Sequence, residues 1–392
     1  MWNRRYAIFA FVVPLGFAYA CSSDPTDPAP TPEGDDSGTG TDGTSQTDSN
    51  NPLPDGSPPP TDGSVTDTGT DAGITCVGNP LTADGGTPDG GANPEAGLRS
   101  LSITYPFVVA ASFLDGPQYI DSDGGALVFT QITSDPPRLL RVGPDGGAAT
   151  SIRTGPVGQG ELPIGNAVRN NVIYTVVADN GTGNGGSIWQ TRPNGDAGPT
   201  LLAAPSTNPN DLAITANGTI FFTDPQYQTN PAGTTAVYRM APDGGVSQVQ
   251  NNLPRPNGIA LSRDGTQLFV GLGPLGGENP NTTKGVLVYT VSAAGVATAP
   301  GTAFLTAADL ADTPDGLAVD VGGNLWVAEA AADGSSQGRV EVFSSAKKKL
   351  GTLSFPTERP TGIAFGGADD KTVYITTETN VWVYPSRCAG VR

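Results

Sequence analysis

Residues 98–392 consist largely of short runs of alternating apolar and polar residues, separated by turns that contain Gly. In RPNGIALSRDGTQLFVG, at 255–271, two such runs flank Asp264 and Gly265. Alternation with a period of two, rich in β-branched and aromatic residues, predicts strands, and Asp-Gly between two strands predicts a hairpin. Because no long stretch repeats with the helical period, a helical solenoid is excluded. The pattern predicts an all-β fold.

The hairpin pattern occurs six times along the chain. The copies begin at Asp115, Ile164, Asn210, Asn257, Asp315 and Thr361. Further strand-like runs follow in most copies, so each unit of roughly 45 residues holds about four short strands, which is the signature of a β-propeller blade. We therefore predict a six-bladed β-propeller. Such a ring closes when one blade takes strands from both chain ends, so the apolar run at 101–113 is expected near the last blade.

The segment before the propeller has a different composition. From Ser22 to about Gly97 the chain is rich in Pro, Thr, Ser, Gly and Asp and has 14 acidic residues but no Lys or Arg. A segment of this kind buries too little apolar surface to offset the entropy of ordering, so residues 21–97 are predicted to be a disordered tether. Residues 98–392 contain 24 acidic and 18 basic residues. No basic patch indicates nucleic-acid binding.

The first 20 residues are patterned as an export signal. MWNRR is a positive n-region, and the fifteen apolar residues after it are short for a membrane span. Ala20 precedes Cys21 in a sequence that resembles the lipobox of bacterial lipoproteins, where the cysteine is lipidated. We expect a cell-envelope lipoprotein, in the periplasm or on the outer surface, attached to the membrane through this lipid alone. A plain secretory signal is the alternative.

The remaining cysteines are Cys76, before the first repeat, and Cys388, near the C-terminus. Because an exported protein folds in an oxidising compartment, we predict a Cys76–Cys388 disulfide that joins the two ends of the propeller. The alternative is two free thiols.

The chain contains no His. This excludes Ser-His-Asp triads, His general bases and His-ligated zinc or haem. Any chemistry must then come from carboxylates, amides, hydroxyls or a metal held by oxygen.

Equivalent positions of the six repeats are rich in oxygen ligands. Four of the first residues are Asp or Asn (Asp115, Asn210, Asn257 and Asp315), and Asn166 lies two residues after Ile164. The first strand of each propeller blade lines the central channel, so these side chains are expected to converge. Close carboxylates repel each other, and a hard cation relieves the repulsion. Ordinary turn or cap roles are the alternative for each residue alone.

The repeats resemble the family of senescence marker protein (regucalcin), gluconolactonase and luciferin-regenerating enzyme. The resemblance covers about 110–386 and rests on PNDLAITANGTIFFTDPQY, RPNGIALSRDGTQLFVG, PDGLAVDVGGNLWVAEA and GIAFGGADDKTVYITT. It implies a six-bladed propeller with one divalent cation in the channel, and hydrolysis of lactones by an activated water. Ca²⁺ is the expected cation, with Mg²⁺, Mn²⁺ or Zn²⁺ as alternatives.

The resemblance also implies roles for single residues. The metal ligands would be Asp115, Asn257 and Asp315, and Asp315 would accept a proton from the attacking water. Asn210 would bind that water or the substrate. Asn166 would line the same pocket, and Asn208 takes the place where many sugar-lactone enzymes have Arg. Asp115 stands where the family has Glu.

We therefore predict a monomeric, metal-dependent hydrolase of a small lactone or ester. The first alternative is a non-catalytic binding propeller that a cation stabilises. A strictosidine-synthase-like ligase would need a Glu base that has no counterpart in the repeats, and a streptogramin-lyase-like enzyme would need His.

Overall fold

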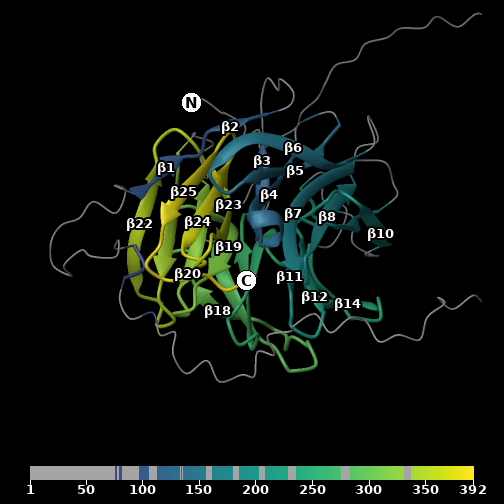
Figure 1. Cartoon of the computed structure of the whole chain (residues 1–392). Helices are drawn as coiled ribbons and strands as arrows, with labels where there is room; N and C mark the ends of the chain where they lie inside the picture. Colours follow the sequence, from purple (N-terminus) through teal and green to yellow (C-terminus); the bar gives the residue numbers. More distant parts are fainter. Residues whose placement is uncertain are drawn as a thin grey trace, which may run out of the picture. The chain divides into compact units, whose positions relative to one another are not determined.

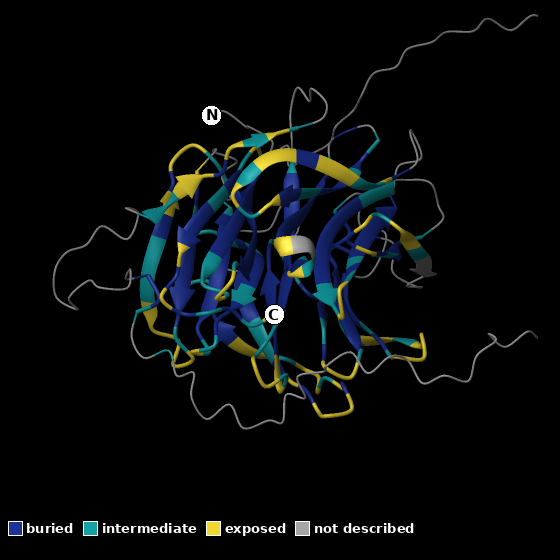
Figure 2. Cartoon of the chain, in the orientation of Figure 1, coloured by how far each residue is buried: buried dark blue, intermediate teal, exposed yellow. Residues whose placement is uncertain are grey.

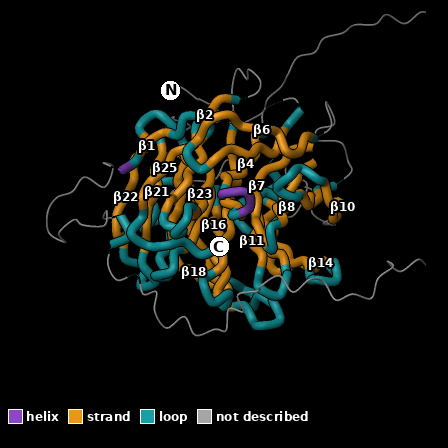
Figure 3. Tube along the Cα trace, viewed as in Figure 1, coloured by secondary structure: helices purple, strands orange, loops and turns teal. Residues whose placement is uncertain are grey.

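The computed structural model describes residues 76, 79–81, 97–105, 113–132, 134, 136–155, 161–179, 185–202, 208–227, 235–274, 283–330 and 337–392. The signal sequence, Cys21 and almost all of the tether lie outside these residues. Strands dominate the described part, and its main helical element is the 3₁₀ turn η2 (Ser122–Gly124) (Figure 3). Within the described ranges, no helix has both the length and the apolar character needed to cross a membrane.

The strands form six sheets, which are the six predicted blades (Figure 1). The first blade contains β3 (Leu114–Ile120), β4 (Ala126–Gln131), β5 (Arg138–Gly143) and β6 (Gly146–Thr154). The second contains β7 (Glu161–Arg169), β8 (Val172–Asp179), β9 (Ser187–Thr191) and β10 (Ala197–Leu202). The third contains β11 (Leu212–Ile214), β12 (Ile220–Asp224), β13 (Ala236–Met240) and β14 (Val246–Asn251). The fourth contains β15 (Pro256–Leu261), β16 (Gln267–Leu272), β17 (Gly285–Thr290) and β18 (Thr302–Leu305). The fifth contains β19 (Thr313–Val319), β20 (Leu325–Ala330), β21 (Gly338–Phe343) and β22 (Lys349–Phe355).

The sixth blade closes the ring with both ends of the chain. It contains β23 (Pro360–Gly366), β24 (Thr372–Thr377), β25 (Val381–Pro385) and, as its outermost strand, the N-terminal β1 (Arg99–Ser100). β1 pairs antiparallel with β25, whereas β2 (Ile103–Thr104) pairs in parallel with β6 of the first blade. The segment expected at the last blade therefore connects the last blade to the first, and residues 106–112 lie outside the described part.

The first strands of the blades form the centre of the ring. Each contacts the next, and β23 contacts β3, which completes the circle. These strands and their neighbours are buried, whereas outer strands such as β6 and β22 carry exposed and intermediate residues (Figure 2). The apolar cores lie between adjacent blades: Trp326 of the fifth blade meets Phe365 of the sixth edge-on, with ring centroids 5.4 Å apart.

Hydrogen bonds also join neighbouring blades near the hub. The Thr130 hydroxyl donates to the carbonyl of Ile164 at 2.6 Å, and that of Thr223 donates to the carbonyl of Asn257 at 2.7 Å. The Thr361 hydroxyl donates to the Leu114 carbonyl at 2.7 Å, across the junction between the last blade and the first. The carbonyls of Ile164 and Asn257 lie within the register shifts of β7 and β15, where a hydroxyl donor satisfies an acceptor outside the regular ladder.

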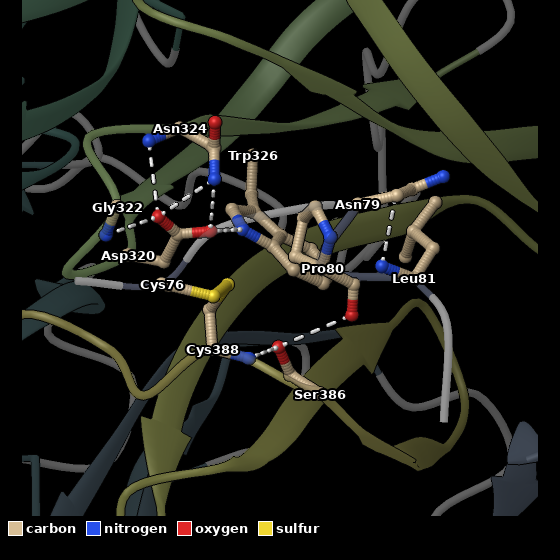
Figure 4. The surroundings of a disulfide bond; sticks show 10 residues. All are labelled: Cys76, Asn79, Pro80, Leu81, Asp320, Gly322, Asn324, Trp326, Ser386 and Cys388. Carbon is tan, nitrogen blue, oxygen red and sulfur yellow. Dashed lines mark hydrogen bonds between the residues drawn. A yellow bond between two sulfur atoms is a disulfide. The ribbon is translucent and has the colours of Figure 1, made fainter. Parts of the chain in front are cut away.

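A disulfide joins Cys76 to Cys388, with the Cα atoms 5.4 Å apart (Figure 4). Asp320 lies beside it and accepts hydrogen bonds from the backbone of Gly322, the backbone and amide of Asn324 and the Trp326 indole. A buried carboxylate that accepts this many hydrogen bonds stabilises the conformation of its turn. The disulfide attaches Cys76, which precedes the propeller, to Cys388, which follows its last strand.

Candidate active site

Five of the six inner strands have a register shift at the repeat position that the sequence singles out. The shifts lie between Asp115 and Gln118, Pro163 and Asn166, Pro256 and Ile259, Pro314 and Leu317, and Pro360 and Gly362. A bulge of this kind bends the strand and changes the direction of a side chain, and bulges are common next to active sites. The polar residues of the repeats therefore lie where the inner strands depart from regular pairing.

A Gly at each of these bulges lets neighbouring inner strands approach closely. A Cβ on Gly258 would lie 2.0 Å from the Asp315 carbonyl oxygen, and one on Gly116 would lie 2.6 Å from the Ile164 carbonyl oxygen. Only Gly is compatible with this spacing. In the third blade the matching position is Asp211 rather than Gly.

The inner strands enclose a small cavity of about 40 Å³ at the centre of the ring. This is room for a few waters or for a cation with a water. Five predicted site residues line this cavity: Asp115, Asn166, Asn210, Asn257 and Asp315. Asp211 and Thr361 also line it. The radial convergence that the repeats predict is thus present in the structure.

The three carboxylates of the cavity perturb one another. Burial, and then the charge of Asp211, raise the pKa of Asp115 to about 8, although a hydrogen bond from the Gly116 backbone acts against this. Burial and the charge of Asp315 raise the pKa of Asp211 to about 7, against two backbone hydrogen bonds. Burial and Asp115 raise the pKa of Asp315 well above its ordinary value. Burial and mutual repulsion therefore disfavour the charged forms of these carboxyl groups, and a bound cation would favour them.

The three asparagines of the cavity differ in how far their amides are already used. Asn166 donates to the Gly116 carbonyl at 2.6 Å and accepts from the Thr175 hydroxyl at 2.6 Å, so it joins two blades. Asn257 donates to the Tyr227 hydroxyl at 3.1 Å. The side chain of Asn210 has no hydrogen-bond partner among the described residues, and it is the amide most available to a ligand.

Asn208 is fully buried and is not among the described residues that line the cavity. Its side-chain amide donates to the Asp179 carbonyl at 2.9 Å, and its backbone N–H donates to Asp224 at 3.3 Å. Its predicted contact with substrate stays a prediction. In this structure Asn208 connects the end of β8 in the second blade to the end of β12 in the third.

Asp211 is the site residue that the sequence reasoning missed. Its two carboxylate oxygens accept from the backbone of Leu212 at 2.9 Å and of Ile259 at 3.1 Å, so it connects the third blade to the fourth. The repeats did contain a signal for it, because five copies have Gly at this slot and only one has a charged residue.

The cavity presents carboxylate and amide groups to a divalent cation. Within the described ranges, no group of three or more Asp, Glu, Cys or His side chains is arranged so that it could hold a metal. A cation would therefore need amide oxygens as well as carboxylates, and Asn210 and Asn257 present amides at the same cavity as Asp115 and Asp315. An oxygen-only donor set with excess negative charge suits a hard cation such as Ca²⁺. The residues that line the cavity therefore fit a divalent cation of this kind.

Similar proteins match this chain over most of the propeller. A gluconolactonase of Zymomonas mobilis is 26% identical over 310 residues, which are 72% of this chain and 81% of that protein. The solved structure of a gluconolactonase from Xanthomonas campestris is 26% identical, covers 70% of this chain and 86% of that chain, and superposes with a TM-score of 0.55. A calcium-binding regucalcin from Agrobacterium tumefaciens shares the fold, with 15% identity, 74% and 97% coverage and a TM-score of 0.53.

The model of one protein family, described as the SMP-30/Gluconolactonase/LRE-like region, matches residues 115–379. The match starts at the first residue of the first repeat and ends after β24 of the last blade. It therefore spans the whole ring of inner strands, and the chain belongs to the SMP-30/Gluconolactonase/LRE-like family.

Proposed function

We propose that this protein is a lactone hydrolase that uses one divalent cation, Ca²⁺ in the first instance, in the central cavity. The observation that carries the proposal is the convergence of Asp115, Asn210, Asn257 and Asp315 on one cavity at the hub. The gluconolactonases similar to this chain support the choice of a lactone as substrate. In such a reaction water adds to the lactone carbonyl and the ring C–O bond breaks, which gives a hydroxy acid.

In this proposal Asp115, Asn257 and Asp315 hold the cation. When bound, it supplies positive charge that stabilises the developing oxyanion and lowers the pKa of water. Asp315 accepts the proton of the attacking water and returns it to the ring oxygen as that bond breaks. Asn210 orients the water or the lactone, because its amide has no protein partner among the described residues. Asn166, held between two blades, fixes the wall.

The test is turnover of a panel of lactones by wild type, Asp315→Asn and Asn210→Ala in the presence of CaCl₂. Loss of a proton acceptor is expected to lower kcat by a factor on the order of 10²–10⁴. Asp243→Asn is the matched control, because Asp243 is an exposed acid in the turn between β13 and β14. Full turnover by Asp315→Asn would refute the mechanism.

The cation is tested separately by calorimetry on protein that has been stripped with a chelator. Wild type is expected to bind one Ca²⁺ and to gain thermal stability, and Asp115→Asn is expected to bind it at least tenfold more weakly, because a carboxylate ligand is lost. If Ca²⁺ stabilises the protein but no lactone is hydrolysed, the non-catalytic binding propeller is the correct alternative.

We also propose that the protein is an exported monomer, anchored in the cell envelope by a lipid on Cys21. The support is the signal-like sequence before Cys21 and the acidic segment after it, both outside the described residues. Mass spectrometry of the membrane-extracted protein should find an acylated N-terminal cysteine, and Cys21→Ser should release the protein from membranes. Recovery of unmodified wild type in the soluble fraction would contradict the anchor.

A further inference from the structure

Three side chains near the cavity offer hydrogen-bond donors for which the mechanism has no use. Tyr227 follows β12, Arg255 directly precedes β15, and Thr313 begins β19. They come from the third, fourth and fifth blades, at the strand ends that also carry Asn257 and Asp315. We call Tyr227, Arg255 and Thr313 the donor rim.

The donor rim is one connected cluster. The Tyr227 hydroxyl accepts a hydrogen bond from the Asn257 amide at 3.1 Å, and the Arg255 guanidinium carbon lies 4.9 Å from the centroid of the Tyr227 ring. A Cβ on Gly273 would lie 3.8 Å from the Tyr227 hydroxyl and 3.0 Å from Cγ2 of Thr313. The side chains of Tyr227 and Thr313 therefore approach the same glycine from the third and fifth blades.

Two of the donors are buried and unused. Among the described residues, neither Nε of Arg255 nor Oγ1 of Thr313 has a hydrogen-bond partner. A buried donor without an acceptor loses its hydrogen bond to water and gains none in return, so native proteins rarely leave one without a ligand or water. Tyr227 accepts from Asn257, which leaves its own proton free to be donated.

The position of Tyr227 is built into the chain. Gln226, the residue before it, has a left-handed φ of 58°, which a residue with a side chain adopts only when its surroundings require it. The Asp224 carboxylate fixes this conformation by accepting from the Gln226 backbone at 3.2 Å and from its side chain at 2.7 Å. Strain that is held in this way next to a cavity indicates a functional placement.

The charge of the donor rim indicates what it binds. Arg255 is a permanent cation, and within the described ranges no carboxylate pairs with it, whereas Arg359 nearby is paired with Glu378. A substrate with a negative charge would therefore place that charge at Arg255 and its lactone carbonyl at the hub.

We propose that the donor rim is a substrate subsite for a carboxylate, so that the preferred substrates are lactones with a carboxylate substituent. This inference rests on the proposed lactone hydrolysis and adds the substrate class. The Arg255 Nε–H and the hydroxyls of Tyr227 and Thr313 donate to the two oxygens of the substituent. No bond of the substituent changes in the reaction.

The experiment compares γ-carboxy-γ-butyrolactone with its carboxamide, which has the same shape without the charge. Wild type is expected to prefer the carboxylate in kcat/KM by a factor on the order of ten or more, because charged hydrogen bonds are stronger than neutral ones. Arg255→Gln should lose this preference. Arg263→Gln should retain it, because Arg263 is an exposed residue of the turn between β15 and β16 and the change in net charge is identical.

A binding measurement makes the test independent of turnover. Calorimetry with the ring-opened product, α-hydroxyglutarate, should show at least tenfold weaker binding to Arg255→Gln than to wild type and to Arg263→Gln. If melting curves show that Arg255→Gln is unfolded, Thr313→Val, which keeps the shape of the side chain, should reduce the preference several-fold.

The outcomes separate the two proposals. If wild type hydrolyses both lactones with equal kcat/KM, or if Arg255→Gln keeps the preference, the subsite is refuted and the lactone hydrolase stands. If no lactone is hydrolysed, the proposed function fails and calorimetry decides the subsite alone. Equal affinity of wild type and Arg255→Gln for α-hydroxyglutarate would then refute it.

Discussion

The disulfide between Cys76 and Cys388 gives the most direct prediction about stability. It connects residues that are 312 positions apart, and its Cα–Cα distance of 5.4 Å lies within the ordinary range for disulfides. A crosslink over so long a loop restricts the unfolded chain much more than the native one, in which β1 and β25 already hold the two ends together. Replacing both cysteines by Ser should therefore destabilise the protein through its unfolded state.

The magnitude follows from the length of the loop. The chain-entropy relation gives about 5–6 kcal/mol for a closed loop of this size as an upper value, and measured effects are commonly smaller. For a folded domain of roughly 300 residues this corresponds to a fall in Tm of roughly 5–10 °C.

Calorimetry or circular dichroism, with and without a reductant, measures the effect. The oxidised wild type should have the highest Tm. The reduced wild type should have the same Tm as the Cys76→Ser/Cys388→Ser variant, and a reductant should not change the Tm of that variant. Equal Tm values for the oxidised wild type and the double variant would refute the reasoning.

Three further predictions concern the packing of the blades. Burial and then a neighbouring carboxylate raise the pKa of Glu329 to about 9, so the folded state holds a proton that the unfolded state releases above about pH 4.5. Between pH 5 and 9 the Tm of wild type should therefore fall more than the Tm of Glu329→Gln. Parallel curves of Tm against pH would contradict this. Gly258→Ala should strongly reduce stability in urea, because its Cβ would lie 2.0 Å from the Asp315 carbonyl, whereas Gly245→Ala, at an exposed turn, should have little effect; equal urea midpoints would contradict the packing argument. Asp320→Ala should cost about 3–5 kcal/mol, since it leaves several buried donors without an acceptor, and a loss below 1 kcal/mol would show that water replaces the carboxylate.

The repeats in the sequence were sufficient to predict the architecture. A strand pattern that recurs six times with turn residues at fixed places has few solutions, and the ring of six sheets is one in which every blade finds two equivalent neighbours. The same repeats placed Asp115, Asn257 and Asp315 at one slot, and symmetry alone then brings them to one axis. Local pattern and global symmetry agree for these residues.

Other parts of the site depended on how neighbouring blades pack. Asn208 and Asn210 are two residues apart, as are residues on one face of a strand, yet Asn208 is bonded to the second blade and only Asn210 lines the cavity. Both precede the regular part of β11, which begins at Leu212, so the alternation of a strand does not apply to them. Their directions are set by the partners that each one finds.

The sequence by itself determined the all-β class, the number of blades and which polar residues share the hub, because these follow from short-range periodicity and from repetition. Tertiary structure alone decided that Asp211 joins the site, that β1 and β2 serve different blades, and that Tyr227 and Arg255 come together beside Asn257. Such contacts join residues that lie far apart in the chain and that no shared pattern marks. They depend on the distances between whole blades, which many side chains set together.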